Sequence, residues 1–484
     1  MAYKDIQYAG EFTLDDCRII STTGNVFDVR DLVEQIEIFE DIYKATISGN
    51  IILKDTTNIV ANFPIIGEER LILGLSTPQT NPTPETTVDY TQHPLIIYKI
   101  NSKENLQERS EVISLQFGSI EGLRNSYCRV SQSYKGQPSE IVDKILRDET
   151  YLNSPKILNA EETSNLVKIV FPNKRPFDCI KHLTNISNSK ESNTSPTYLF
   201  YETTKGYHFR TFDGLSMQPP KMFYRQNTPT LEQTGTFNPK VGLETILNYH
   251  VIPSRDTIKN INNGMISSKL IAHDFYNKKV DNHLYDYLSN FQQEIYPDGG
   301  ESRPLISSSP EPETGKIITE HQDTRIFVSS TSNGYNFSEE EIDDSGNKTG
   351  NIEYPYQSDN LDQTLQRKTS RLLQMTGGIT VNLEVNGTTA LQVGDKIYLE
   401  IETKSTMNNS IEDKDLTGAY IITKLKHIFL RSGELKHTIL MQATKFSTRN
   451  TYPTGGVSSV GGLGTQPKLA NKSTQTKIQQ FTPI

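Results

Sequence analysis

Two pairs of residues in this chain have the types and the spacing that chemistry could use. Cys179 and His182 stand three positions apart on a segment with helical spacing, which suits a nucleophile with its base or two metal ligands. His427 and His437 fall on two strands that we expect to pair, so their rings could face each other. No third ligand or orienting acid stands near the first pair. We therefore interpret Cys179 as a half-buried thiol, and His182, His427 and His437 as surface histidines.

Two further segments resemble binding loops only in composition. The acidic run Glu339–Asp344 could suggest calcium, but the glycine and the closing glutamate of an EF-hand loop are absent. Gly455–Gly464 is rich in glycine, yet it has no Lys-Ser/Thr pair and precedes no helical pattern, as a phosphate loop would. We read the first as a solvated acidic loop and the second as a flexible linker.

No enzymatic site, cofactor site or metal site is predicted. Glycoside cleavage needs two carboxylates across a cleft, and no motif pairs any two of the 58 acidic residues. Cys17, Cys128 and Cys179 lie far apart, which argues against a zinc ribbon and against a disulfide framework. The net charge of −9 disfavours a protein that grips nucleic acid through phosphates.

The composition favours short strands joined by many turns. Apolar residues make up only 34% of the 484 residues, tryptophan is absent, and turn-forming residues occur throughout. The length suits two to four domains. We see no signal peptide and no apolar stretch long enough to span a membrane. We expect a protein that is made in a reducing cytoplasm and stays soluble until it assembles.

The elements that would position these residues can be read from hydrophobic periodicity. Residues 12–119 read as strands, most clearly at Lys44–Leu53, where apolar and polar residues alternate. Helical spacing appears at 138–150 and again from Pro176, and a hairpin follows at 197–212. These segments predict a β domain followed by a small α+β domain.

The second half of the chain repeats the strand-rich character. Strands are expected at 246–252 and 265–275, long loops at 289–358, and a helix near 360–375 that glycines at 377 and 378 would stop. The clearest strand signal covers 379–446 and ends in a hairpin formed by 420–430 and 435–446. Residues 447–484 lack the apolar residues for a core of their own.

The order of these signals suggests an internal duplication. The phrase Ile66-Gly67-Glu68 precedes one strand, and Val393-Gly394-Asp395 precedes another at the corresponding place in the later series. We therefore predict a mainly β chain with two related antiparallel β-barrels, a small α+β domain and an extended C-terminal tail. The predicted ranges are 1–120 for the first barrel, 121–240 for the α+β domain, 241–288 with 377–446 for the split second barrel, 289–376 for a loop-rich insertion with one helix, and 447–484 for the tail.

The chain resembles the central hub proteins of T-even-like contractile-tailed phages over most of its length. The segments that carry the resemblance are 245–288, beginning Thr-Ile-Leu-Asn-Tyr-His-Val-Ile, and 436–445, Lys-His-Thr-Ile-Leu-Met-Gln-Ala-Thr-Lys. The resemblance implies two tube-like barrels per subunit and a homotrimeric ring with pseudo-sixfold symmetry. One face would meet the tail-tube initiator or tube ring, the other would hold the trimeric spike or tail lysozyme, and wedge proteins could bind outside.

The same resemblance implies a place and a role in the virion. The protein would lie in the tail baseplate, be assembled in the host cytoplasm, and let the genome pass through its lumen without specific binding. The tail 447–484 would run toward the spike, with Tyr452, Leu463 and Phe481 as contacts. Two alternatives stay open: a receptor- or glycan-binding tail component that uses the Tyr-rich hairpin 198–212, and an unrecognised hydrolase.

Overall fold

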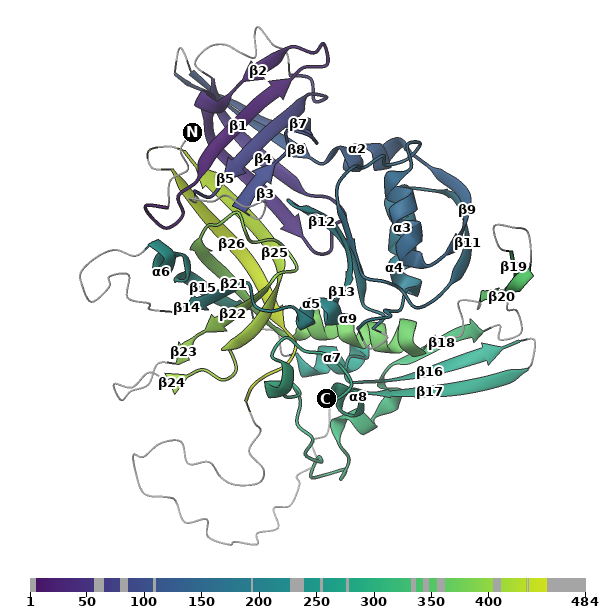
Figure 1. Cartoon of the computed structure of the whole chain (residues 1–484). Coiled ribbons are helices and arrows are strands. Elements are labelled where there is room, and N and C mark those ends of the chain that lie inside the picture. The colour runs from purple at the N-terminus through teal and green to yellow at the C-terminus, as the bar shows by residue number, and fades with distance from the viewer. Residues whose placement is uncertain are drawn as a thin grey trace, which may run out of the picture. The chain divides into compact units, whose positions relative to one another are not determined.

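One large β-sheet runs through both ends of the chain in the computed structural model (Figure 1). The structure describes residues 6–450 apart from short gaps at 56–64, 79–85, 108–109, 193–194, 227–238, 253–255, 276–277, 332–336, 343–347, 355–361, 404–410, 432 and 434. The prediction of a mainly β chain with helices concentrated between the strand-rich parts is confirmed. In the described part, no helix is both long and apolar enough to cross a membrane.

Eleven strands of this sheet follow one another in a single path. In spatial order they are β15 (Ile246–Ile252), β21 (Ile379–Asn386), β26 (Lys436–Lys445), β25 (Gly418–Leu430), β3 (Val33–Asp41), β4 (Ser48–Asp55), β8 (Ser110–Gly118), β7 (Leu95–Gln107), β5 (Arg70–Ser76), β1 (Thr13–Ile20) and β2 (Val26–Asp28). Off this path, β6 (Thr87–Asp89) pairs with β5, and β22 (Lys396–Glu400) pairs with β25 and with β14 (Met222–Arg225).

The contact between β25 and β3 joins the two strand-rich parts. Seven residue pairs, from Lys424 opposite Asp41 to Leu430 opposite Gln35, form this antiparallel ladder. Beneath it lie two apolar clusters. One is built from residues of β1, β3–β5, β7 and β8, and Phe429 of β25 reaches into it; the other is built mainly from residues after position 200. The chain thus has two cores under one sheet.

The glycine of the repeated phrase has the same backbone conformation in both places. Gly67 and Gly394 have φ angles of 99° and 87°, a left-handed conformation that favours glycine. The hydrogen bonds around the two glycines differ. Glu69, two residues after Gly67, accepts the backbone N–H of Gly67 at 2.9 Å, whereas Asp395, directly after Gly394, accepts that of Gln392 at 2.9 Å. The duplication and the boundaries of the two barrels therefore stay a prediction.

The segment between the strand-rich parts contains helices packed on small sheets. Its elements are α2 (Ile120–Tyr127), β9 (Val130–Gly136), α3 (Pro138–Arg147), β10 (Leu158–Ala160), β11 (Val167–Lys174), α4 (Pro176–Ile186), β12 (Tyr198–Thr203), β13 (Gly206–Thr211) and α5 (Phe212–Met217). The predicted helices therefore exist and begin at the two prolines, which occupy the first helical turn. The predicted hairpin is β12–β13.

The Tyr-rich hairpin is a core element and not an exposed aromatic platform. Tyr198, Tyr201, Tyr207 and Phe209 are each at most 2% exposed. They pack with Ile141, Ile180 and other apolar residues of α3 and α4, or with the second core. A sugar could not stack on these rings, so the glycan-binding alternative loses the residues on which it rested.

A separate set of elements lies between β15 and β21 in sequence. It contains α7 (Thr257–Asn263), β16 (Ser267–Asp274), β17 (Lys279–Asp286), α8 (Tyr287–Phe291), the 3-10 turns η3 (Gly299–Glu301), η4 (Ile318–Glu320) and η5 (Gln322–Thr324), β18 (Ile326–Thr331), β19 (Phe337–Ile342), β20 (Lys348–Tyr354), the π-type turn η7 (Asp362–Arg367) and α9 (Lys368–Gly377). Four short elements complete the described part of the chain: η1 (Arg30–Leu32), α6 (Pro239–Leu243) and the pair β23 (Glu402–Thr403) with β24 (Ile411–Glu412).

Two expectations for this region are wrong. The strand expected at 265–275 does not join β15 in the large sheet, because α7 and the left-handed Gly264 turn the chain away, and β16 pairs with β17 and β18. The stretch 289–358 is not only loops, since it contributes β18, β19 and β20. Its polar composition concealed strands that are only six or seven residues long.

Candidate functional site

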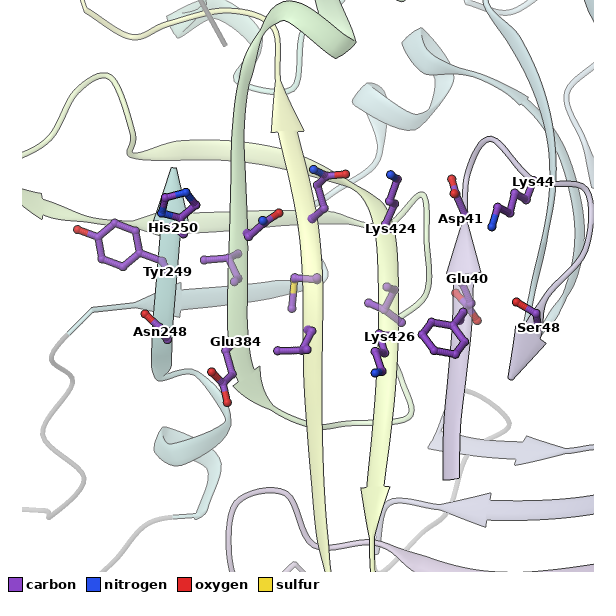
Figure 2. A pocket seen from close by; sticks show the side chains of 17 residues that line it. Glu40, Asp41, Lys44, Ser48, Asn248, Tyr249, His250, Glu384, Lys424 and Lys426 are labelled. Atoms are coloured by element: carbon purple, nitrogen blue, oxygen red, sulfur yellow. The ribbon is translucent and has the colours of Figure 1, made fainter. Parts of the chain in front are cut away.

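A groove crosses one face of six neighbouring strands. Figure 2 shows it crossing β15, β21, β26, β25, β3 and the start of β4, with a volume of about 620 Å³. Strand alternation creates it. Along β25, Leu425, His427 and Phe429 are buried, whereas Lys424 and Lys426 stand on the open face.

The strand registers align the groove residues in rows across the seam between β25 and β3. One row of directly opposed residues is Asn248, Glu384, Leu440, Lys426, Phe39 and Ser48. The next row is His250, Asn382, Gln442, Lys424 and Asp41. Residues from both ends of the chain therefore meet on one surface that neither end could form alone.

The charges of this groove are mixed and partly paired. Lys426 lies 2.8 Å from Glu37, and its ammonium group also lies 5.0 Å from the centre of the Phe39 ring. Lys44 and Lys424 share the groove with Asp41 and Glu384. Because cations and carboxylates alternate, the surface lacks the cluster of cations that would hold a phosphate backbone tightly.

The groove lies within the eleven-strand path, in which two strands have open edges in the described part of the chain. At one end of the path, β15 pairs only with β21. Farther along, β7 pairs with β8 along its length, but its described pairing with β5 covers only Leu95 and Ile96. Leu247 on β15 and Ile100 on β7 are 46% and 41% exposed. Open edges with exposed apolar residues are sites where further strands add.

A buried carboxyl group behind the groove joins three parts of the chain. Glu40 of β3 accepts the backbone N–H of Thr204 at 2.7 Å and that of Val393 at 2.8 Å. Thr204 lies in the turn of the β12–β13 hairpin, and Val393 belongs to the loop before β22. Burial raises the pKa of Glu40 to about 7.

The raised pKa predicts a pH-dependent contribution to stability. Between the unfolded pKa near 4.5 and the folded pKa near 7, folded Glu40 binds more protons than unfolded Glu40 does. The contribution of Glu40 to the free energy of unfolding is therefore fully present below about pH 4.5 and is lost as the pH rises to 7. Because of Glu40, the free energy of unfolding of the wild type should fall by roughly 2–3 kcal/mol over this range, and Glu40→Gln should not show this fall.

Urea unfolding at pH 5 and at pH 8 measures the effect. The stability difference between wild type and Glu40→Gln should be smaller at pH 8 than at pH 5. The matched control is Glu384→Gln on the open face of β21, which should change stability equally at both pH values. A wild-type advantage that stays the same from pH 5 to pH 8 would refute the assignment.

Cys179 and His182 do not form a catalytic pair. Cys179 is fully buried, not half-buried as expected, and burial raises the pKa of its thiol to about 12. His182 is partly buried and packs edge-on to Phe171, and burial lowers its pKa. A thiol with so high a pKa supplies almost no thiolate, so it is a core residue.

The expectation that His427 and His437 are surface residues is wrong. Both are at most 1% exposed, with Nδ1 of His427 3.0 Å from Nε2 of His437. The ring of Phe429 stacks on His437. Burial lowers the pKa of His427 to about 3, so both rings are neutral at ordinary pH. His427 lies on the same buried face of β25 as Leu425 and Phe429, and His437 is paired with Phe429 across the ladder, so both rings face the core.

The remaining sequence candidates have simple outcomes. Part of the acidic run, expected as a loop, lies on β19, where Glu340 pairs with Lys348 of β20. Gly455–Gly464 and the predicted spike contacts Tyr452, Leu463 and Phe481 lie outside the described residues. Among the described residues, no group of three or more His, Cys, Asp or Glu side chains could hold a metal ion.

The groove and the charges buried behind it were not found from the sequence. Glu40 looked like one more acidic residue on a strand, and only the strand pairing places it beneath the groove. The alternation of Lys424 and Lys426 with apolar residues was the signal in the sequence. It indicated that one face of this strand is exposed, but it could not identify the strands that lie beside it.

The comparisons with known proteins give similar solved structures. No family model and no curated protein matches the chain. A tail protein from Neisseria meningitidis has a TM-score of 0.49 at 10% identity, covering 90% of this chain and 96% of that one. A 43 kDa prophage tail protein from Shewanella oneidensis has a TM-score of 0.48 at 7% identity, covering 89% and 98%. A component of the E. coli type VI secretion system has a TM-score of 0.35 at 10% identity, covering 92% and 79%. The first two of these structures are tail proteins, and the second comes from a prophage.

Proposed function

We propose that this chain is a structural hub subunit of a contractile phage tail baseplate and not an enzyme. Three copies would form a pseudo-sixfold ring between the hexameric tail tube and the trimeric spike. The observation that carries the proposal is the seam between β25 and β3, which joins strands from both ends of the chain in one sheet, with open edges at β15 and along most of β7. The resemblance of the sequence to hub proteins supports the same role.

The open edges suggest how the ring closes. Strand β15 of one copy would pair with β7 of the next, a head-to-tail contact that generates a closed ring when the rotation fits. Leu247 and Ile100 would then lie beside each other at the subunit boundary and lose their exposure to water. Closure would extend the grooved sheet around the axis and cover the open edges of β15 and β7.

The grooved face would line the lumen of this ring. Its alternating cations and carboxylates, with asparagine and glutamine between them, would let the genome pass without specific binding. The tube initiator or tube ring would meet one face of the ring, and wedge proteins could contact its outside. Residues 447–484 would run toward the spike or tail lysozyme, with Tyr452, Leu463 and Phe481 as contacts, in a baseplate assembled in the host cytoplasm.

Solution mass tests the ring directly. Light scattering should give a mass near three chains, either alone or as a three-to-three complex with the spike protein. Leu247→Glu or Ile100→Glu should reduce this mass to that of one chain without unfolding it, because each places a charge at the closing edge.

The control is Val26→Glu on β2, which is 52% exposed but lies at the far end of the sheet path. It should leave the trimer intact. A wild-type chain that stays monomeric at every concentration, with and without the spike, would sink the proposal. The proposal would also fail if the control variant lowered the measured mass as strongly as the two edge variants do.

A further inference from the structure

We propose that Ser447–Asn450 form a strap, a short segment that holds the chain just after β26 against the rest of the protein. A force applied to residues beyond 450 would then act on the contacts of this strap before it acts on β26. The inference goes beyond the proposed ring, because it concerns how one chain carries tension whatever binds further along. The first residues of the segment that lacks a core of its own are packed against the rest of the chain, since Ser447 and Thr448 are at most 1% exposed.

One side of the strap is attached to the segment around η3. Thr448 and Arg303 exchange two backbone hydrogen bonds, with N–H to O distances of 2.7 and 3.0 Å, in a short antiparallel bridge. The hydroxyl groups of Ser447 and Ser302 lie 3.1 Å apart in the buried space beside it. These contacts hold Ser447 and Thr448 against residues about 145 positions earlier in the sequence.

The other side of the strap is attached to the second strand-rich part. The hydroxyl group of Thr448 donates to Asp415 at 2.8 Å. The guanidinium group of Arg449 lies 2.7 Å from Glu412, 2.5 Å from Glu301 and 2.9 Å from the hydroxyl oxygen of Tyr398. A single arginine therefore joins both sides, and the strap cannot be lifted from one side without breaking contacts with the other.

The chain behind the strap is held differently. Strand β26 leads directly into it and lies between β21, with eight residue pairs, and β25, with nine. At its end, Phe446 is fully buried and the Lys445 ammonium group donates to the backbone of Thr417 at 2.7 Å. Tension along a central strand must shear both ladders together, whereas the strap can detach one contact at a time. We therefore expect the chain to detach in two steps: the strap should detach first at low force, and β26 should detach afterwards at higher force.

Single-molecule pulling on the full chain tests this order. One handle is attached at Asn382→Cys on β21 and the other at the C-terminus, in a Cys128→Ser background because the other two cysteines are buried. The wild-type protein should show a short early extension from release of the strap, of the order of 3.3 Å for each freed residue, before a larger rupture at higher force.

Substitutions in the strap should change only the early event. Arg449→Met and, separately, Thr448→Val should shift it to lower force or abolish it, and leave the larger rupture in place. The matched control is Arg431→Met, which removes another arginine that contacts an acidic residue, Asp31, far from the strap.

The proposal is overturned if the wild-type trace lacks a separate early event, or if neither strap variant alters it. Failure of the ring proposal would appear independently, as a monomeric mass in light scattering, because the strap requires only one chain.

Discussion

Replacing Arg371 with methionine is expected to lower the free energy of unfolding by about 3–5 kcal/mol, because it removes the cation that two buried carboxylates share. Arg371 of α9 is 1% exposed. Its guanidinium group contacts Asp213 of α5, lies 3.2 Å from Glu294 and donates to the carbonyl oxygen of Ile295 at 2.7 Å.

Two aromatic rings complete the surroundings of this side chain. The ring centres of Tyr296 and Phe446 each lie 4.8 Å from the guanidinium carbon of Arg371, so both rings form cation–π contacts with it. Phe446 directly follows β26, and Tyr296 belongs to the segment after α8. Arg371 is thus a point where the elements between β15 and β21 are fastened to the second core.

Urea unfolding monitored by circular dichroism measures this loss. Arg18→Met is the control, since Arg18 pairs with Asp16 on the surface and its side chain is 41% exposed, a setting in which ion pairs contribute about 0–1 kcal/mol. Adding Asp213→Asn and Glu294→Gln to Arg371→Met should restore part of the stability. A loss below about 1 kcal/mol would show that the cluster is not held together by this charge.

Replacing Lys156 with methionine is expected to cost about 3–5 kcal/mol at pH 8 and clearly less at pH 5. The Lys156 ammonium group lies 2.8 Å from Glu121 and 2.6 Å from Glu202, and all three side chains are at most 8% exposed. Glu202 also accepts the backbone N–H of Ile47 at 3.0 Å, which connects the α+β segment to the first strand-rich part.

The pH dependence follows from two carboxylates that share one cation. Burial raises the pKa of Glu202. Burial also raises the pKa of Glu121, but the Lys156 charge outweighs it, so that the net shift is downward. Without the lysine, both carboxyl groups would have raised pKa values in the folded state. Their ionisation would then penalise folding above the unfolded pKa, and protonation at lower pH would relieve this penalty.

Unfolding at the two pH values distinguishes this electrostatic effect from simple loss of packing. Lys190→Met is the control, because Lys190 pairs with Glu162 while 60% exposed and should be nearly neutral to stability at both pH values. If the loss in Lys156→Met is the same at pH 5 and pH 8, the carboxylates do not repel each other and the interpretation fails.

Local features of this protein were predicted well from the sequence because they depend on neighbours along the chain. The alternation at Lys44–Leu53 indicated β4, the prolines at 138 and 176 marked the starts of α3 and α4, and the turn at Lys205-Gly206 marked the hairpin. The glycine of the repeated Gly-acid phrase has a left-handed conformation in both copies.

Sequence periodicity could not identify which strands become neighbours. It showed that one face of β25 is apolar, but His427 and His437 seemed exposed because nothing in the sequence reveals that β3 completes the sheet beside them. In the same way, β16 had the pattern of a barrel strand, and only the turn at α7 and Gly264 directs it to a different sheet.

What the sequence determined by itself is therefore the type of the strongly patterned segments, the mainly β character of the chain and its resemblance to tail hub proteins. Only the tertiary structure decided the seam between β25 and β3, the groove across it, the buried charges of Glu40, Lys156 and Arg371, and the strap at 447–450. The physical reason is that periodicity records which side of a segment avoids water, whereas these features depend on pairings between residues tens to hundreds of positions apart, such as Arg303 with Thr448.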